Sequence, residues 1–127
     1  MKFRRSSEID EVLSFLTELG DEAQLLAGGT DIMIQLERGE ISAQTLLHIE
    51  RVAGMRGITE NGRLTLGALT THSDLARDPV LCDRYQSVAH AASLIGSWQT
   101  QSVGTIGGNV CNASPAADLL PPLLVHN

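Results

Sequence analysis

The sequence has few aromatic residues, few cysteines and little positive charge, and each shortage excludes a class of protein. Phe, Trp and Tyr make up 3% of the 127 residues, so the core must be built from Leu, Ile, Val and Ala. The formal net charge of -6 argues against broad binding to nucleic acid or to anionic membranes, for which a basic patch is expected. It still allows one bound phosphate group, because charges are screened beyond about 8 Å and local backbone donors then dominate.

Cysteine usage and hydropathy exclude further classes. Cys82 and Cys111 form no CxxC pair and no zinc or iron–sulfur spacing, and nothing indicates a disulfide scaffold. The start, MKFRRSSEIDEV, has basic residues but no apolar stretch after them, and no segment approaches the ~20 apolar residues of a membrane span. We therefore expect a cytoplasmic protein with no membrane span and no metal site of its own.

The apolar pattern predicts an α+β or mixed α/β arrangement. A capping box formed by Ser7 and Asp10 should open a helix that ends at Gly20. The other expected elements are strands over 23–27 and 45–49, a helix over 30–38, a hairpin over 58–67 and helices over 71–77 and 84–96. Asn61-Gly62 suits a type I′ turn in the hairpin.

The last third of the chain gives weaker signals. Residues 97–108 carry little helical pattern and are expected to form loop and short strands. Residues 116–120 should form a helical turn interrupted by Pro121-Pro122. The apolar run 123–127 follows with no closing cap, which suggests a domain cut before its last strands.

Two glycine pairs are the informative sites, Ala27-Gly28-Gly29-Thr30-Asp31 and Thr105-Ile106-Gly107-Gly108-Asn109. The first lies between an expected strand and an expected helix, where consecutive glycines let a ligand approach the backbone with no Cβ in the way. Unpaired N–H groups at such a helix start favour a phosphate. The second pair has a similar character, and its Thr and Asn add side-chain donors. A tight turn without a ligand is the simpler explanation for either pair alone.

The spacing excludes the common nucleotide-binding loops, because the chain has neither GxxxxGK[ST] nor G-x-G-x-x-G. A pyrophosphate held by two separate glycine pairs remains possible. Asp118 could then accept hydrogen bonds from ribose hydroxyls, or it could be an ordinary acid in the first turn of a helix. Three other residues could contact a ligand, but we interpret His72 as a histidine at a solvated helix start, Cys111 as a small buried cysteine and Trp98 as packing over the loop that leads to the second pair.

Three segments, LLAGGTDIMIQLERGE, GALTTHSDL and SVGTIGGNVCNASPAADLLPPLL, resemble in order and spacing the flavin subunit of the molybdenum hydroxylase family. The family includes xanthine dehydrogenase, aerobic carbon monoxide dehydrogenase, nicotinate dehydrogenase and 4-hydroxybenzoyl-CoA reductase, and the resemblance spans essentially the whole chain. It implies FAD as the cofactor and the PCMH-type FAD-binding fold, an α+β fold. Residues 1–53 would form a small N-terminal α/β subdomain with the first pyrophosphate loop, and residues 54–127 part of a second FAD-binding subdomain.

The resemblance also implies roles for residues. The turn 27–31 would hold the FAD pyrophosphate through backbone N–H groups, and the turn 105–109 would close on the other side of the same dinucleotide. Ser102 would touch the phosphates, Asp118 would bind the ribose of the adenosine half, and Ser114 begins that last turn. The implied cofactor-binding set is Ala27, Gly28, Gly29, Thr30, Asp31, Ser102, Thr105, Ile106, Gly107, Gly108, Asn109, Ser114 and Asp118. No catalytic residue is expected, because the flavin does the redox chemistry.

The family's flavin subunit is roughly twice as long as this chain, so we expect a fragment that lacks part of its flavin site and is inactive alone. The resemblance implies an oxidoreductase subunit in a complex with two partners. Electrons would leave a substrate at a molybdopterin-binding large subunit, cross the [2Fe-2S] clusters of a small subunit, reach FAD and pass to NAD or another acceptor. A truncated, flavin-free scaffold or packing module is the first alternative, and an unrelated phosphate-binding module is the second.

Overall fold

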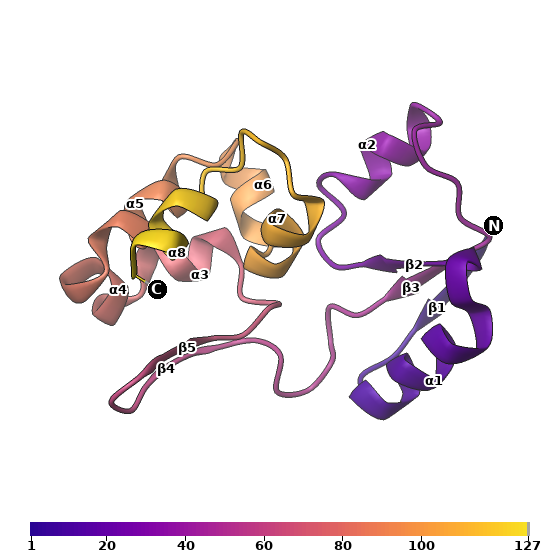
Figure 1. The fold of residues 1–127 in the computed structure, drawn as a ribbon, viewed down its shortest axis with the longest axis horizontal. Helices are drawn as coiled ribbons and strands as arrows, with labels where there is room; N and C mark the ends of the chain where they lie inside the picture. The colour runs from indigo at the N-terminus through magenta and orange to yellow at the C-terminus, as the bar shows by residue number, and fades with distance from the viewer. Residues whose placement is uncertain (127) are drawn as a thin grey trace. The chain divides into compact units, whose positions relative to one another are not determined.

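The computed structural model describes residues 1–126, and the chain divides into two compact units, Met1–Gly54 and Met55–Asn127. Asn127, the last residue of the expected apolar run, lies outside the described residues. Helices and strands occur in both units (Figure 1), as expected for an α+β protein. Among residues 1–126, none of the helices has the length and apolar character needed to cross a bilayer.

The first unit is a three-stranded parallel sheet with two helices. Its strand order is β1-β3-β2, so the last strand in sequence lies in the middle. This position explains why Leu46 and Leu47 of the central strand are 3% and 0% exposed. The elements in chain order are β1 (Lys2–Arg5), α1 (Ile9–Leu19), the 3-10 turn η1 (Gly20–Glu22), β2 (Ala23–Leu26), α2 (Ile32–Glu37) and β3 (Thr45–His48).

The two helices of this unit lie on opposite faces of the sheet (Figure 1). On one face, the Arg4 guanidinium lies 4.6 Å from the ring centre of Phe15 in α1. On the other face, the side chains of Leu26 in β2 and Met33 in α2 both lie close to Gly29, within contact distance of a Cβ built there. Parallel strands are joined by right-handed crossovers, and the crossovers from β1 to β2 and from β2 to β3 run in opposite directions, which places their helices on opposite faces.

The start of α1 differs from the expected capping box, and one strand was missed. The N-cap is Glu8 and makes no side-chain cap, so the box of Ser7 and Asp10 is wrong. Ser6 makes side-chain hydrogen bonds at the start of this helix instead. Its hydroxyl accepts from the Glu8 N–H at 3.1 Å and donates to the Glu11 carboxylate. The stop at Gly20 is confirmed, with φ of 51°. The missed strand β1, KFRR, has a charged sequence because it is an edge strand that pairs with β3.

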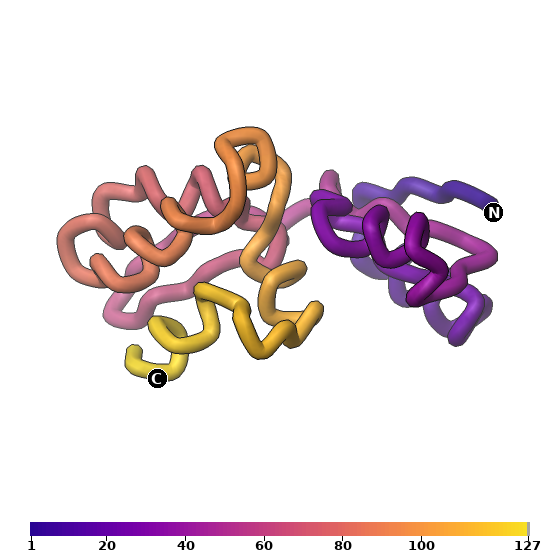
Figure 2. The backbone as a smooth tube through the Cα atoms, turned by 90° about the horizontal axis from the view of Figure 1, so that it is seen from above, coloured from indigo at the N-terminus to yellow at the C-terminus, as the bar shows by residue number. Residues whose placement is uncertain are grey.

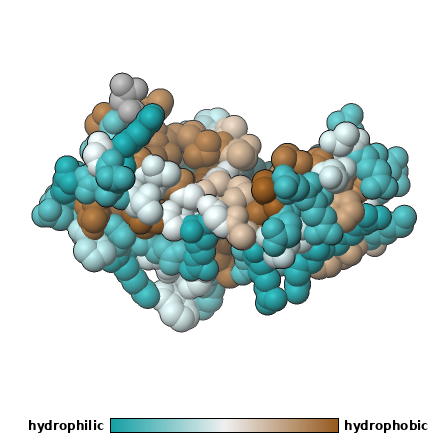
Figure 3. Space-filling model, turned by 90° about the horizontal axis from the view of Figure 1, so that it is seen from below, coloured by the Kyte–Doolittle hydropathy of each residue, from teal (hydrophilic) through white to brown (hydrophobic). Residues whose placement is uncertain are grey.

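Over its described residues, 55–126, the second unit packs a β-hairpin against six short helices. Its core contains Leu75, Leu81, Val88, Ala89, Ala92, Ile106 and Leu119, with Ile58, Leu64 and Leu66 of the hairpin packed against it. The elements are β4 (Ile58–Glu60), β5 (Leu64–Leu66), α3 (His72–Arg77), α4 (Pro79–Arg84), α5 (Gln86–Ser93), α6 (Trp98–Val103), α7 (Ile106–Asn112) and α8 (Leu120–His126). Figure 2 follows the chain from α4 and α5 through α6 and α7 to α8 in yellow. Figure 3 shows apolar surface, in brown, between the polar residues of the face that it presents.

The hairpin is confirmed, but its turn is not type I′. Glu60 pairs with Leu64, so three residues connect the strands rather than two. Gly62 has φ of 70°, whereas Ala113 is the one non-glycine residue among residues 1–126 with positive φ, so Asn61 does not adopt the left-handed conformation that type I′ requires.

The expected loop over 97–108 is wrong, because helices α6 and α7 occupy most of it. Each begins at a capping hydroxyl: Ser97 accepts from the Thr100 N–H, and Thr105 accepts from the Gly108 N–H. The expected helix 84–96 is shorter in the structure, where it is α5, and α4 before it was not predicted. Pro121 and Pro122 do not interrupt a helix; they lie in the first turn of α8, where a missing N–H leaves no helical bond unmade.

Candidate functional site

The first glycine pair forms a turn between β2 and α2, with backbone donors that make no internal bond. Gly29 has φ of 75°, a conformation that a residue with a side chain rarely adopts. Within the described part of the chain, the N–H groups of residues 28–32 donate to no backbone carbonyl. The turn itself is partly exposed. Adjacent N–H groups without an internal acceptor can form a concave site for an anion.

The second glycine pair lies in the first turn of α7, and its backbone donors are already used. The Ile106 N–H donates to Thr70 O at 3.0 Å and the Gly107 N–H to Ala68 O at 2.8 Å. The Gly108 N–H donates to the Thr105 hydroxyl at 3.1 Å, which caps the helix. The Asn109 N–H donates to Thr105 O at 3.0 Å. The two glycine pairs therefore look alike in sequence but differ in the donors they offer.

The two glycines of this second turn also differ from each other. A Cβ built at Gly107 would lie 2.7 Å from Ala68 O, so packing against the backbone of residue 68 requires a glycine. A Cβ built at Gly108 would meet one atom within 4 Å, the Thr105 hydroxyl oxygen at 3.1 Å. Gly107 is thus needed by the fold, whereas Gly108 leaves the surface of the turn open.

The segment 68–72 holds the turn 104–107 by backbone contacts. An antiparallel bridge joins Thr71 to Thr105, and the His72 N–H donates to Gly104 O at 3.0 Å. Thr70, which is 0% exposed, connects this segment to Gly57. Its hydroxyl donates to Gly57 O and accepts from the Gly57 N–H, both at 3.0 Å. The motif GALTTHSDL therefore supports the second glycine turn.

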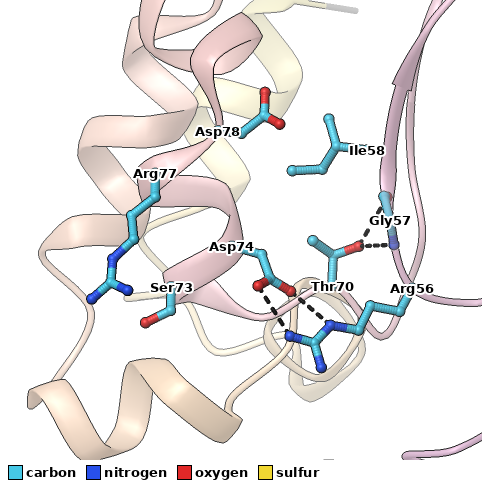
Figure 4. Close-up of a pocket in the computed structure, with 8 residues that line it drawn as sticks. All are labelled: Arg56, Gly57, Ile58, Thr70, Ser73, Asp74, Arg77 and Asp78. Carbon is cyan, nitrogen blue, oxygen red and sulfur yellow. Dashed lines mark hydrogen bonds and ion pairs between the residues drawn. The ribbon is translucent and has the colours of Figure 1, made fainter.

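An ion pair lies next to this segment and borders a cavity of about 360 Å³ (Figure 4). Arg56 Nε donates to Asp74 Oδ2 at 2.8 Å and Arg56 Nη2 to Asp74 Oδ1 at 3.0 Å. Burial raises the pKa of the Asp74 carboxyl, but hydrogen bonds from Arg56 and Thr71 and the Arg56 charge outweigh burial, so the pKa of Asp74 lies below its ordinary value. Arg77, Ser73 and Asp78 also line the cavity.

Four other predicted site residues lie around α6 and α7. Ser102 is exposed in α6, where its hydroxyl donates to Trp98 O at 2.9 Å. The Asn109 side-chain oxygen is buried with no hydrogen-bond partner among residues 1–126. Ser114 and Asp118 lie in the loop between α7 and α8; the Ser114 hydroxyl accepts from the Ala116 N–H at 3.3 Å, and Asp118 is exposed. Thr105 and Ile106 are both 6% exposed, so their side chains serve the cap and the core.

Three structural interpretations of single residues are wrong. His72 is 3% exposed rather than solvated, because its ring packs against Gly104, where a Cβ would lie 2.8 Å from the imidazole. Cys111 is exposed rather than buried, since it lies on the outer side of α7. Trp98 is 66% exposed rather than packed over the loop that leads to the second turn. Within the described range, no group of three or more His, Cys, Asp or Glu side chains is placed to hold a metal ion.

Comparison with known proteins gives these turns a context. The family model described as "FAD binding domain in molybdopterin dehydrogenase" matches residues 1–127. The chain belongs to this family. It is 34% identical over 127 residues to a xanthine dehydrogenase FAD-binding subunit of Escherichia coli O157:H7, covering 98% of this chain and 43% of that protein. It is 32% identical over 118 residues to the carbon monoxide dehydrogenase medium chain of Hydrogenophaga pseudoflava, covering 92% and 41%.

Solved structures confirm the family fold. Carbon monoxide dehydrogenase from Hydrogenophaga pseudoflava, in a form that lacks the Mo-pyranopterin moiety, superposes with a TM-score of 0.90 at 32% identity over 94% of this chain and 42% of that chain. The α+β, PCMH-type FAD-binding fold predicted from the resemblance is therefore confirmed, as is FAD as the cofactor of the family. The chain spans about two fifths of the length of the curated relatives that it matches.

The residues of this FAD-binding domain fit the flavin nucleotide in part. The turn 27–31 offers free backbone donors for a diphosphate. The Asn109 oxygen is a buried acceptor without a partner in the part of the chain that the structure describes, and such an atom has a free-energy penalty that a ligand donor would remove. The backbone of residues 106–109 offers no free donor, so any contact from that turn must come from its side chains or through a shift of the turn.

The role of the segment 68–72 in holding the second turn was not predicted. Ala68, Thr70 and Thr71 hold the turn 104–107, and Asp74 completes a capping box with Thr71. The sequence carried one usable signal, the spacing Thr71-x-x-Asp74 at the start of an expected helix. The backbone bonds from Ala68 and Thr70 to α7 join residues more than 35 positions apart, and no local pattern indicates them.

Proposed function

We propose that this chain supplies part of the FAD site in the flavin subunit of a molybdenum hydroxylase. In this proposal a molybdopterin-binding large subunit oxidises the substrate, and a [2Fe-2S] small subunit carries the electrons to the flavin subunit, which passes them to NAD or another acceptor. The names of the relatives support it, since they are FAD-binding or medium subunits of xanthine and carbon monoxide dehydrogenases. The complex would work in the cytoplasm, whose reducing conditions suit the two free cysteines of the chain.

The turn 27–31 is the observation that carries this proposal. Its free N–H groups at residues 28–32 occur in a chain that matches an FAD-binding family along its whole length. They would hold the pyrophosphate, and the positive φ of Gly29 gives the backbone a left-handed bend of the kind found in anion-binding turns. FAD, when bound, supplies the redox chemistry, and the chain's task is to bind and orient it. Residues 1–53 would thus form the subdomain of the first loop and residues 54–127 part of a second FAD-binding subdomain.

The second turn would contribute side chains rather than backbone. Asn109 would use its unpartnered buried oxygen, and Asp118 would bind ribose hydroxyls through an exposed carboxylate. Ser102 and Ser114 would have to release their present bonds, to Trp98 O and to the Ala116 N–H, before contacting phosphate. Thr105 and Gly107 would act indirectly, by keeping the turn folded.

Titration of the purified chain with FAD, followed by quenching of flavin fluorescence, tests the proposal. We expect saturable binding that is weakened by Gly28→Val and by Asp118→Ala. Asp83→Ala, an exposed acid in α4, is the matched control and should bind as the wild-type chain does. Gly107→Val is a poor probe, because a side chain there meets Ala68 O and would unfold the turn whether or not flavin binds.

A flavin-free scaffold is the second candidate, favoured by the used backbone donors of residues 106–109. The same titration separates the two. A chain with a native circular dichroism spectrum and no quenching at any FAD concentration would support the scaffold and contradict the flavin site.

A further inference from the structure

Asp74 belongs to none of the predicted cofactor residues, yet hydrogen bonds connect its carboxylate to the second glycine turn. We propose that Asp74 is a positioning residue for the turn 104–109: with Arg56 it fixes Thr71, and Thr71 fixes the turn. The inference deepens the proposed flavin site and rests on it for its effect on FAD, whereas its effect on the turn can be measured without flavin.

The first step runs from Asp74 to Thr71. The Thr71 N–H donates to Asp74 Oδ2 at 3.2 Å, and the Thr71 hydroxyl accepts from the Asp74 N–H at 3.1 Å. This reciprocal capping box sets the direction in which the chain enters α3. The two bonds from Arg56 to the same carboxylate restrict its rotation further (Figure 4).

The second step runs from Thr71 to the turn. Thr71 is bridged to Thr105, whose hydroxyl caps α7 through the Gly108 N–H. On either side of the bridge, the Ile106 N–H donates to Thr70 O and the His72 N–H donates to Gly104 O, both at 3.0 Å. A rotation of the Thr71 peptide would therefore move the partners of residues 104–106 together.

Packing cannot replace this polar link at Asp74. The side chain of Asp74 is 33% exposed, and the cavity of about 360 Å³ lies beside it between α3 and residues 56–58. Thr70 is held separately by its two bonds to Gly57, so the segment has two anchors, and Asp74 provides the one that reaches Thr71. Loss of its carboxylate leaves the Thr71 N–H without that acceptor, and no apolar contact compensates.

A matched pair of variants tests the inference. Asp74→Ala removes the capping carboxylate of α3, and Asp78→Ala removes that of α4, where Asp78 accepts from the Leu81 N–H at 3.0 Å. Both variants lose one carboxylate that accepts a backbone N–H at the start of a helix, and Asp74→Ala also loses the ion pair with Arg56. Asp78 has no link to the turn 104–109 among the bonds of the described residues. Amide hydrogen exchange is then measured on the flavin-free chains at Ile106, Gly107 and Gly108, and FAD affinity is measured by fluorescence quenching.

We expect Asp74→Ala to speed exchange at these three amides by about three- to tenfold and to weaken FAD binding by a similar factor, with Asp78→Ala near the wild-type values. Asp74→Asn keeps an oxygen that can accept from Thr71 and should restore slow exchange at least in part. If Asp74→Ala does not fold, the comparison of Asp74→Asn with Asp78→Asn decides the question, because Asn weakens the Arg56 pair in the first and leaves that pair intact in the second.

The outcomes separate this inference from the proposed function. Equal exchange rates in the Asp74 and Asp78 variants would overturn the positioning role. Faster exchange in Asp74→Ala with unchanged FAD affinity would overturn the effect of Asp74 on flavin binding and leave its positioning of the turn supported. Faster exchange together with no FAD binding by any chain, wild-type included, would refute the proposed function and leave the positioning of the turn supported.

Discussion

Substitution of Gly107 by alanine should destabilise the second unit without any involvement of flavin. The added Cβ would lie 2.7 Å from Ala68 O and 3.0 Å from Ala68 Cβ, which is closer than van der Waals contact permits. The turn cannot simply move away, because Ala68 O also accepts the Gly107 N–H at 2.8 Å. Relief of the clash therefore stretches or breaks that hydrogen bond.

The magnitude follows from these opposing effects. Overpacking against backbone costs about 1–3 kcal/mol, and loss of one backbone hydrogen bond adds about 1 kcal/mol. Replacement of glycine by alanine in a helix recovers about 0.5–1 kcal/mol. We therefore expect Gly107→Ala to lower the free energy of unfolding by about 2 kcal/mol. Gly108→Ala is the control: its Cβ would meet the Thr105 hydroxyl alone, at 3.1 Å, so its change should stay within about 1 kcal/mol.

Urea unfolding followed by tryptophan fluorescence is the assay, because the single tryptophan, Trp98, lies in α6 of the same unit. The midpoint of Gly107→Ala should fall clearly below those of the wild-type and Gly108→Ala chains. An unchanged midpoint for Gly107→Ala would refute the contact between α7 and Ala68. An equal fall in both variants would show that any side chain in this turn is harmful, and the distinction between the two glycines would be lost.

Three further predictions address the site and its supports. Asp118→Ala should leave the unfolding midpoint unchanged, since the side chain is exposed, and should raise the FAD dissociation constant about tenfold; unchanged affinity would remove Asp118 from the site. Asn109→Leu should stabilise the flavin-free chain by about 1 kcal/mol in urea unfolding, because it removes a buried oxygen without a described partner; a loss of stability would contradict that assignment. The pKa of Asp74 is lower in the folded chain than in the unfolded chain, so its charge contributes stability that is present above about pH 4 and is lost as pH falls through the folded pKa. The difference in unfolding free energy between wild-type and Asp74→Asn should therefore shrink on acidification, and a difference independent of pH would be evidence against the ion pair.

Apolar pattern and turn residues were enough to predict the strand 23–27 and the hairpin. The strand 23–27 ends one residue early, at Leu26, and the hairpin lies where Asn61-Gly62 indicated it. β1 could not be found this way, because an edge strand with charged residues shows no hydrophobic period. Helices α6 and α7 were missed for another reason: they are six and seven residues long, and α7 depends on bonds from Ala68 and Thr70 that are distant in sequence.

The sequence drew attention to both glycine pairs but did not distinguish their hydrogen bonding. Both glycine pairs were recognised, but the same letters led to one expectation, a backbone seat for phosphate, for both of them. The structure gives free N–H groups at residues 28–32 and used N–H groups at residues 106–109. Whether the N–H groups of a turn are hydrogen-bonded depends on which other segment of the chain packs against the turn. The sequence of the turn itself does not contain that information.

Three glycines in these turns, Gly29, Gly107 and Gly108, are glycine for different reasons. Gly29 is required by its positive φ, and Gly107 is required by the backbone of Ala68. Gly108 has neither requirement, since its φ is ordinary and its Cβ would press on one side-chain oxygen of its own turn. A glycine in a helix destabilises it by about 1 kcal/mol relative to alanine, so a glycine that the fold does not need indicates a surface that must stay open. We therefore expect a side chain at Gly108, rather than one at Gly107, to hinder the close approach of a nucleotide to the second turn.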